Sequence, residues 1–241
     1  MAGNGGRLPS SKSGPHKRIL VIDVGGTNVK LLLSGEKNPV KIPSGSRMTA
    51  KAMVEAVLVE AATWKYSAVS IGYPGPVLDG KPAADPHNLA PGWVDFDFSR
   101  ALACPVKIVN DAAMQALGSY QGGRMLFLGL GTGLGSALLV DNVLVPTELA
   151  HLPYMKARTF EDYVGIRGLK RLGKKRWRGH VLRVIEVLKK ALGAEYVVLG
   201  GGNARLLESL PEGVMLGDNS NAFRGGFKLW QPQNHSKRKA A

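Results

Sequence analysis

Cysteine is nearly absent from this 241-residue sequence, in which Cys104 is the single example. One cysteine excludes an intramolecular disulfide and any structural zinc site built from several cysteines. Long apolar runs are absent too, because no stretch reaches the roughly 18 to 20 uncharged residues that span a bilayer, and the basic N-terminus has no apolar signal core. These absences predict a soluble, cytoplasmic protein without a membrane partner.

Acidic residues are scarce relative to basic ones, with 18 Asp and Glu against 32 Lys and Arg and a net charge of +14. Much of the excess lies between residues 156 and 190, where the only acidic residues are Glu161, Asp162 and Glu186. Such a positive field favours a polyanionic partner, either nucleic acid or a long phosphate chain, whose binding depends strongly on salt. The alternative is a solvated helical face.

The patterning of apolar residues divides the chain into two α/β lobes. Residues 1–16 and 231–241 hold almost nothing to bury, so we expect a flexible arm and a flexible basic tail. A strand, a glycine turn and a hairpin open each half of the remaining chain. We therefore predict a smaller lobe over 17–109, a larger lobe over 110–230 and a central cleft between them.

Hydrophobic periodicity predicts the elements within these lobes. The expected helices are 48–64, 112–120 and 180–192. The expected strands are 18–23, 29–34, 68–72, 106–109, 125–128, 136–140, 143–145 and 196–199, with a hairpin turn at Asp141 and Asn142.

Three glycine-rich turns, at 22–28, 129–135 and 199–203, each follow an apolar run. Glycine lets backbone N–H groups approach a phosphate without interference from a Cβ atom. Three such turns in one chain predict a phosphate donor that is held from several sides. The turn residues expected to contact the donor are Gly25, Gly26, Thr27, Asn28, Gly131, Thr132, Gly133, Gly201 and Gly202.

Two carboxylates at predicted strand ends indicate phosphoryl transfer. Asp23 precedes the first glycine turn, where a carboxylate can hold hydrated Mg²⁺ beside the donor phosphates; the alternative is a turn cap. Asp111 follows the strand 106–109. The alternative to a role in phosphoryl transfer is that Asp111 only caps the N-terminus of the helix that begins there. Lys30 is either a further contact to the donor or an exposed lysine on a strand.

Six motifs follow one another along the chain: DVGGT at 23–27, GYPG at 72–75, VNDA at 109–112, LGTGLG at 130–135, ELAH at 148–151 and GGGN at 200–203. In this order they resemble the ROK family of sugar kinases, within the two-lobe actin-like ATPase (ribonuclease H-like) fold. The resemblance covers essentially all of residues 18–230. Segments 158–163, 173–177 and 200–204 are more narrowly similar to the polyphosphate glucokinase branch.

The resemblance implies a kinase in which Asp111 takes the proton from the 6-hydroxyl of glucose as the phosphoryl group arrives. Mg²⁺ is the implied cofactor, held at Asp23 through water, and a homodimer is expected from the family alone. The groups implied to hold the remaining sugar hydroxyls are the backbone at Gly75 and the side chains of Asn88, Asn110, Glu148, His151 and Glu161.

One departure from the family pattern concerns zinc. Many members carry a cysteine-rich zinc motif just after the Glu-x-Gly-His element, whereas here the cysteines are absent and Ala150 replaces the glycine. We therefore expect no zinc, and we expect His151 to contact the sugar without a metal.

The donor implied by the narrower resemblance is inorganic polyphosphate. The basic segment 170–178, which includes Lys174 and Lys175, would hold successive phosphates by charge if it lines the exit of the cleft. If that segment faces away from the cleft, ATP is the simpler donor, and the chain is then an ATP-dependent hexokinase for glucose, mannose or another hexose. Use of both donors is also open.

Two non-catalytic alternatives remain from different functional classes. A sugar-responsive repressor would need an N-terminal helix-turn-helix, and residues 1–17 are too short and too polar to form one. A polyanion-binding relative fits the net charge, but Asp23, Asp111 and Glu148 argue for retained catalysis. We therefore expect sugar and phosphate ligands rather than nucleic acid.

Overall fold

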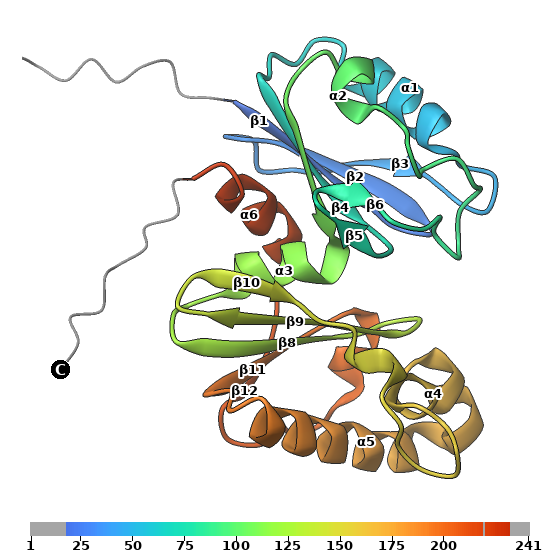
Figure 1. Cartoon of the computed structure of the whole chain (residues 1–241), viewed down its shortest axis with the longest axis vertical. Coiled ribbons are helices and arrows are strands. Elements are labelled where there is room, and N and C mark those ends of the chain that lie inside the picture. The colour runs from blue at the N-terminus through green and yellow to red at the C-terminus, as the bar shows by residue number, and fades with distance from the viewer. Residues whose placement is uncertain (1–17, 219, 232–241) are drawn as a thin grey trace, which may run out of the picture.

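The computed structural model describes residues 18–218 and 220–231, so the predicted arm and nearly all of the predicted tail lie outside the described residues. Two five-stranded sheets form the frame of the molecule (Figure 1). The first sheet has the order β3-β2-β1-β4-β7, with β1 (Ile19–Val24), β2 (Asn28–Leu33), β3 (Val40–Pro43), β4 (Ala68–Tyr73) and β7 (Val106–Asn110).

The second sheet repeats this connectivity in the order β10-β9-β8-β11-β12. In each sheet three antiparallel strands are followed by two strands that pair in parallel. The duplicated arrangement confirms the predicted mixed α/β class. The strands of the second sheet are β8 (Arg124–Leu130), β9 (Leu134–Val140), β10 (Val143–Pro146), β11 (Tyr196–Gly200) and β12 (Val214–Leu216).

Helices cover the outer faces of both sheets, which is why the central parallel strands are buried. α1 (Ala50–Glu60) and α2 (Phe98–Ala101) pack on the first sheet. α5 (Ile166–Ala191) and α4 (Phe160–Val164) cover the second sheet, and Trp177 is fully buried there. Each sheet therefore has its own apolar core on its outer side.

Two helices, α3 (Asp111–Ser119) and α6 (Asn221–Lys228), lie between the sheets (Figure 1). α6 was not among the predicted elements. It is fixed to the first sheet by the Ser70 hydroxyl of β4, which donates to the Gly226 carbonyl at 2.6 Å. It is fixed to α3 by the Asn221 amide, which donates to the Ser119 hydroxyl at 2.8 Å. α6, the last of the described helices, thus packs against β1 and β4 of the first sheet.

Glycine at two positions allows α3 and α6 to approach each other. A Cβ atom at Gly118 would overlap the backbone carbonyl of Asn221, and a Cβ atom at Gly225 would overlap that of Met114. Neither obstacle is a flexible side chain, so any larger residue must push the two helices apart.

The helix predicted over 180–192 is the C-terminal half of α5, which begins at Ile166 and is interrupted by a non-helical residue at Gly173 (φ 74°, ψ 160°). The N-terminal half, 166–179, was missed because lysine and arginine dominate the segment 167–178 and obscure the apolar period. Short elements complete the fold: β5 (Val77–Leu78), β6 (Lys81–Pro82), η1 (Leu149–His151) and η2 (Gly202–Leu206).

The described helices include none with the length and apolar character needed to cross a membrane. The hairpin turn predicted at Asp141 and Asn142 is confirmed, since both residues have positive φ (49° and 69°) between β9 and β10. The lobe boundary near residue 110 stays a prediction, because α3, which begins there, packs against both sheets.

Candidate active site

The first glycine turn joins β1 to β2 and is held by its own backbone. The Gly25 N–H donates to the Asn28 carbonyl at 3.1 Å, and the Ser44 hydroxyl donates to the Gly25 carbonyl at 2.6 Å. A Cβ atom at Gly25 would lie 2.8 Å from the Asn28 oxygen, so the tight turn requires glycine. Asn88 packs over this turn, since a Cβ atom at Gly26 would lie 3.2 Å from the Asn88 Cβ. Ser44 was not predicted.

Asp23 stands near the end of β1, and its side chain is only 13% exposed. Lys30, opposite on β2, donates to one carboxylate oxygen of Asp23 at 3.2 Å. The other oxygen has no hydrogen bond from any residue in the described ranges 18–218 and 220–231. Lys30 therefore partly neutralises Asp23 and leaves one oxygen for a cation.

Asp111 follows β7 directly and is the first residue of α3. The N-cap of α3 is Asn110, so the interpretation of Asp111 as only an N-cap is wrong. Burial and then the charge of Asp23 raise the pKa of Asp111 to about 7, and Glu148 adds to the rise. The Ala112 N–H, which donates to Asp111 at 2.8 Å, opposes it. A carboxyl group with this pKa can exchange a proton near neutral pH.

The side chain of Asn110 is oriented by the fold. Its oxygen accepts the N–H groups of Ala112 and Ala113 at 3.0 and 3.3 Å, and its amide donates to the Gly75 carbonyl at 3.0 Å. The structure therefore brings together two of the predicted sugar contacts, Asn110 and Gly75. One N–H of the Asn110 amide is left for a ligand.

The second and third glycine turns are joined to each other. The Asn203 amide donates to the Gly131 carbonyl at 3.0 Å. A Cβ atom at Gly201, where φ is 80°, would overlap the Leu130 carbonyl, whereas one at Gly131 or Gly202 would meet no atom within 4 Å. The two turns thus form a single cradle with open backbone. Asn203 lies in a predicted turn, but its bridging role was not foreseen.

Glu161 lies against the second glycine turn. One oxygen of Glu161 accepts the Leu134 N–H at 3.2 Å and stands where a Cβ atom at Gly133 would be. Its other oxygen pairs with Arg167 at 3.3 Å, and Arg167 also pairs with Asp162 at 3.4 Å. Arg167 was not predicted, because nothing in the sequence separates it from the basic residues around it. A sugar contact for Glu161 stays a prediction.

Glu148 directly precedes η1 and His151 is its last residue, and both are exposed. Neither side chain has a hydrogen bond or ion pair with any residue that the structure describes, so both are available to a ligand. Glu148 is close enough for its charge to act on Asp111. His151 has no comparable link to the site.

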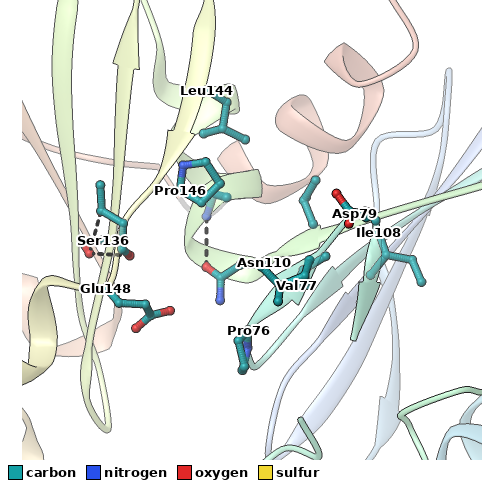
Figure 2. Close-up of a pocket in the computed structure, with 14 residues that line it drawn as sticks. Pro76, Val77, Asp79, Ile108, Asn110, Ser136, Leu144, Pro146 and Glu148 are labelled. Carbon is teal, nitrogen blue, oxygen red and sulfur yellow. Dashed lines mark hydrogen bonds between the residues drawn. The ribbon is translucent and has the colours of Figure 1, made fainter. Parts of the chain in front are cut away.

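A cavity of about 390 Å³ opens between the two lobes (Figure 2). The hairpin β5–β6 borders it on one side and strands β9 and β10 border it on the other. Asn110 and Glu148 are part of its wall, whereas Asp111 is not. The cavity therefore adjoins the predicted proton acceptor without containing it.

Lys174 and Lys175 are exposed on α5 just after the interruption at Gly173. Arg178, one turn later, donates to the Leu206 carbonyl at the end of η2. Residues four apart share a helix face, so Lys174 lies on the side of α5 that faces the end of η2. Neither lysine has an acidic partner among residues 18–218 and 220–231.

The carboxylates of Asp23 and Asp111 suit a magnesium ion that keeps several waters better than a metal ion enclosed by protein ligands. No group of three or more His, Cys, Asp or Glu side chains within the described part of the chain is placed to hold a metal. Mg²⁺ commonly binds one or two carboxylates and takes its other oxygens from water and substrate phosphates. The free oxygen of Asp23 and its electrostatic coupling to Asp111 fit that pattern.

Comparisons with known proteins agree with this geometry. The model of the ROK family matches residues 19–147. Polyphosphate glucokinase from Mycobacterium leprae (strain TN) is 26% identical over 209 residues, which are 76% of this chain and 63% of that protein. Polyphosphate glucokinase from Mycobacterium tuberculosis (strain ATCC 25177 / H37Ra) is 26% identical over 208 residues, which are 76% of this chain and 77% of that protein.

The structure of inorganic polyphosphate/ATP-glucomannokinase from Arthrobacter sp. strain KM superposes with a TM-score of 0.74 at 23% identity. The superposition covers 88% of this chain and 97% of that chain. The likeness confirms the predicted two-lobe actin-like ATPase fold.

Proposed function

This chain belongs to the ROK family, and from that premise we propose that it is a sugar kinase acting on the 6-hydroxyl of glucose or a closely related hexose. The observation that carries the proposal is the position of Asp111 at the end of β7, where burial and the charges of Asp23 and Glu148 raise its pKa to about 7. A proton acceptor of this kind beside two phosphate-binding turns supports phosphoryl transfer more than simple sugar binding.

In the proposed reaction the 6-oxygen of the sugar attacks the terminal phosphorus of the donor. The bond between that phosphorus and the bridging oxygen breaks, and the donor leaves shortened by one phosphoryl group. Asp111 accepts the proton of the 6-hydroxyl. The turns at Gly25 and Gly131 offer N–H groups to the phosphate oxygens, and Asn110 and Glu148 orient the sugar through its remaining hydroxyls.

Asp23 is the residue proposed to hold Mg²⁺, through its oxygen that Lys30 does not occupy. When bound, the ion would neutralise charge on the donor phosphates. Lys30 reduces the repulsion between Asp23 and the incoming phosphates even before a cation binds.

Inorganic polyphosphate is the proposed donor, with ATP as the second candidate. The supporting observation is the exposed, acid-free pair Lys174 and Lys175 on α5, of which Lys174 shares the face toward η2. A phosphate chain leaving the cradle at Gly131 and Gly202 would need only charge for further binding, without recognition of a base or ribose.

The direct test is hexose 6-phosphate formation by the purified chain with Mg²⁺, glucose and either long-chain polyphosphate or ATP. We expect product with both or with polyphosphate alone, and a higher kcat/KM with polyphosphate. Product with ATP alone would reject polyphosphate as the donor but would still support the proposed kinase activity. If no product forms with either donor but polyphosphate binds, the chain is a polyanion-binding relative.

The double substitution Lys174→Ala with Lys175→Ala is expected to raise KM for polyphosphate about tenfold and to leave KM for glucose unchanged. Removing two phosphate contacts should also lower the slope of log KM against log salt by about two. The measurement is initial rate against polyphosphate concentration at several salt concentrations.

A matched control removes the same charge from the other end of α5. Lys189→Ala with Lys190→Ala lies about 20 Å away along the helix axis and should leave KM for polyphosphate within twofold of the unmodified chain. An equal effect of both double substitutions would show that net charge, and not a phosphate path, controls donor binding.

A further inference from the structure

The carboxylate of Glu161 lies beside the turn that is proposed to hold the donor phosphates. One of its oxygens occupies the position of a Cβ atom at Gly133 and accepts the Leu134 N–H at 3.2 Å. The Gly131 N–H donates to the Gly133 carbonyl at 3.2 Å, and at most about 7 Å separates the Cα atoms of residues two apart. A negative charge therefore adjoins the open backbone at Gly131, where it would repel an anionic donor.

Arg167 is the basic residue that compensates this charge. Its guanidinium pairs with the other oxygen of Glu161 at 3.3 Å and with Asp162 at 3.4 Å. Among residues 18–218 and 220–231 it is the only side chain that forms an ion pair with Glu161. Asp162 has further support, because the N–H and the hydroxyl of Thr159 each donate to it at 3.0 Å and the charge of Arg158 acts on it. Of the two carboxylates, Glu161 therefore depends more on Arg167.

The start of α5 fixes the backbone of Arg167 next to the second glycine turn. The Ile166 N–H donates to the Thr132 carbonyl at 3.1 Å. A Cβ atom at Gly165 would lie 2.9 Å from the same oxygen and 3.3 Å from the Cα atom of Gly133, so the two segments are in close contact. The side chain of Arg167 is itself 68% exposed. It can therefore be replaced without loss of core packing.

We infer that Arg167 is a positioning residue for the donor, which cancels the charge of Glu161 at the second glycine turn and so allows phosphates to bind there. The inference rests on the proposed function, because that function places the donor phosphates at this turn. It applies to polyphosphate and to ATP alike, since both would present phosphates to the same backbone. The competing explanation is that Arg167 only joins α4 to α5 through Asp162.

The first substitution, Arg167→Gln, leaves the charge of Glu161 without its ion pair. KM for polyphosphate should then rise about tenfold, because Glu161 is only partly screened by water. The repulsion acts on the bound donor before and during transfer, so kcat should change less than about threefold. Arg167→Lys keeps the positive charge and should stay within about threefold of the unmodified chain in KM. The measurement is initial rate against polyphosphate concentration at saturating glucose.

The decisive measurement is a double-mutant cycle between Arg167 and Glu161. Adding Glu161→Gln to Arg167→Gln removes the unpaired charge and should return KM for polyphosphate to within about threefold of the unmodified chain. Glucose is kept saturating for each variant, because Glu161 is also a predicted sugar contact. Loss of a purely structural residue would not be repaired by removing its partner. A KM for polyphosphate that stays raised in the double variant would overturn the inference.

Two matched controls separate charge compensation from the alternatives. Asp162→Asn removes the other partner of Arg167 and leaves Glu161 paired, so KM for polyphosphate should stay within about twofold. An increase equal to that of Arg167→Gln would show that Arg167 acts by joining α4 to α5. Arg183→Gln removes the same charge from an exposed position of α5 outside the segment 170–178. An equal increase there would show that net charge alone controls donor binding, and either increase would overturn the inference.

Calorimetric titration of the same variants with inorganic triphosphate distinguishes failure of the inference from failure of the proposed function. Phosphoryl transfer with the same KM for polyphosphate in Arg167→Gln and in the unmodified chain would reject the inference and still support the kinase. If no transfer occurs but Arg167→Gln weakens triphosphate binding and Glu161→Gln restores it, the inference stands and the kinase is rejected. Absence of both transfer and triphosphate binding would overturn both.

Discussion

Replacing Asp111 with asparagine is expected to lower kcat about 100- to 10,000-fold, the range typical for loss of a general base. The amide keeps the shape of the side chain and cannot accept the proton of the 6-hydroxyl. KM for glucose should change little, because Asn110 and Glu148 are proposed to orient the sugar. The measurement is steady-state kinetics with glucose and polyphosphate at pH 8.

The pH profile of the unmodified chain tests the same assignment. Its kcat/KM should rise with pH around a midpoint near 7, the pKa to which burial and Asp23 raise the Asp111 carboxyl. The residual activity of Asp111→Asn should lack that rise. Asp95→Asn, at an exposed loop residue, is the control and should keep the full profile. Full activity in Asp111→Asn would remove the general-base role.

The same substitution should stabilise the fold at high pH. Because the pKa of Asp111 is higher in the folded state than in the unfolded state, the native chain binds the proton more tightly and loses stability as pH rises from about 4 to 7. Asparagine removes that loss, so the free energy of unfolding at pH 8 should increase by about 2 to 4 kcal/mol. Below pH 4 the two proteins should be equally stable.

Replacing Gly118 with alanine is expected to reduce the free energy of unfolding by about 3 kcal/mol, which is large for one methyl group. The added Cβ atom would overlap the Asn221 carbonyl, and backbone cannot rotate away as a side chain can. α3 and α6 must then separate, which exposes the apolar contacts of Met114 and Phe223. Urea denaturation followed by circular dichroism measures the change.

Gly179→Ala provides a matched control for the helix packing. Gly179 lies in α5, where a Cβ atom would meet no atom within 4 Å. Alanine there should be neutral or should stabilise by up to about 1 kcal/mol through helix propensity. If Gly118→Ala and Gly179→Ala shift stability alike, close approach of the two helices is not what glycine provides at position 118.

The glycine turns and the strands before them could be predicted because their signals are local. β1 and β8 end just before Gly25 and Gly131, and the turn that follows each strand is closed by hydrogen bonds of its own backbone. The order of these turns, together with the motifs at 72–75, 109–112 and 148–151, also indicated the family. For the same reason the hairpin at Asp141 and Asn142, whose residues tolerate positive φ, was predicted correctly.

Helix α6 could not be predicted because its sequence argues against a helix in isolation. Two adjacent glycines, Gly225 and Gly226, lower its intrinsic propensity. Those glycines are what permit close packing, since a Cβ atom at Gly226 would lie 2.5 Å from Val21. Tertiary packing, and not local helix propensity, therefore determines α6.

The candidate site was predicted best where adjacent residues act together. Asn110 and Asp111 are neighbours in sequence, so their joint position at the end of β7 followed from the strand alone. Glu161 and Arg167 become partners only because α4 and α5 fold against the second glycine turn. No sequence pattern predicts that these two side chains form an ion pair.

The packing of α6 on the first sheet also affects how the chain is made. Val21 on β1 is buried with Ala222 and Phe223 of α6, and Phe223 follows it by 202 residues. At ribosomal rates of about 5 to 20 residues per second, this face of β1 waits roughly 10 to 40 s for its covering helix. During that interval an apolar strand surface is open to chaperones and to other nascent chains. β1 is thus made about 200 residues before the helix that covers this face of it.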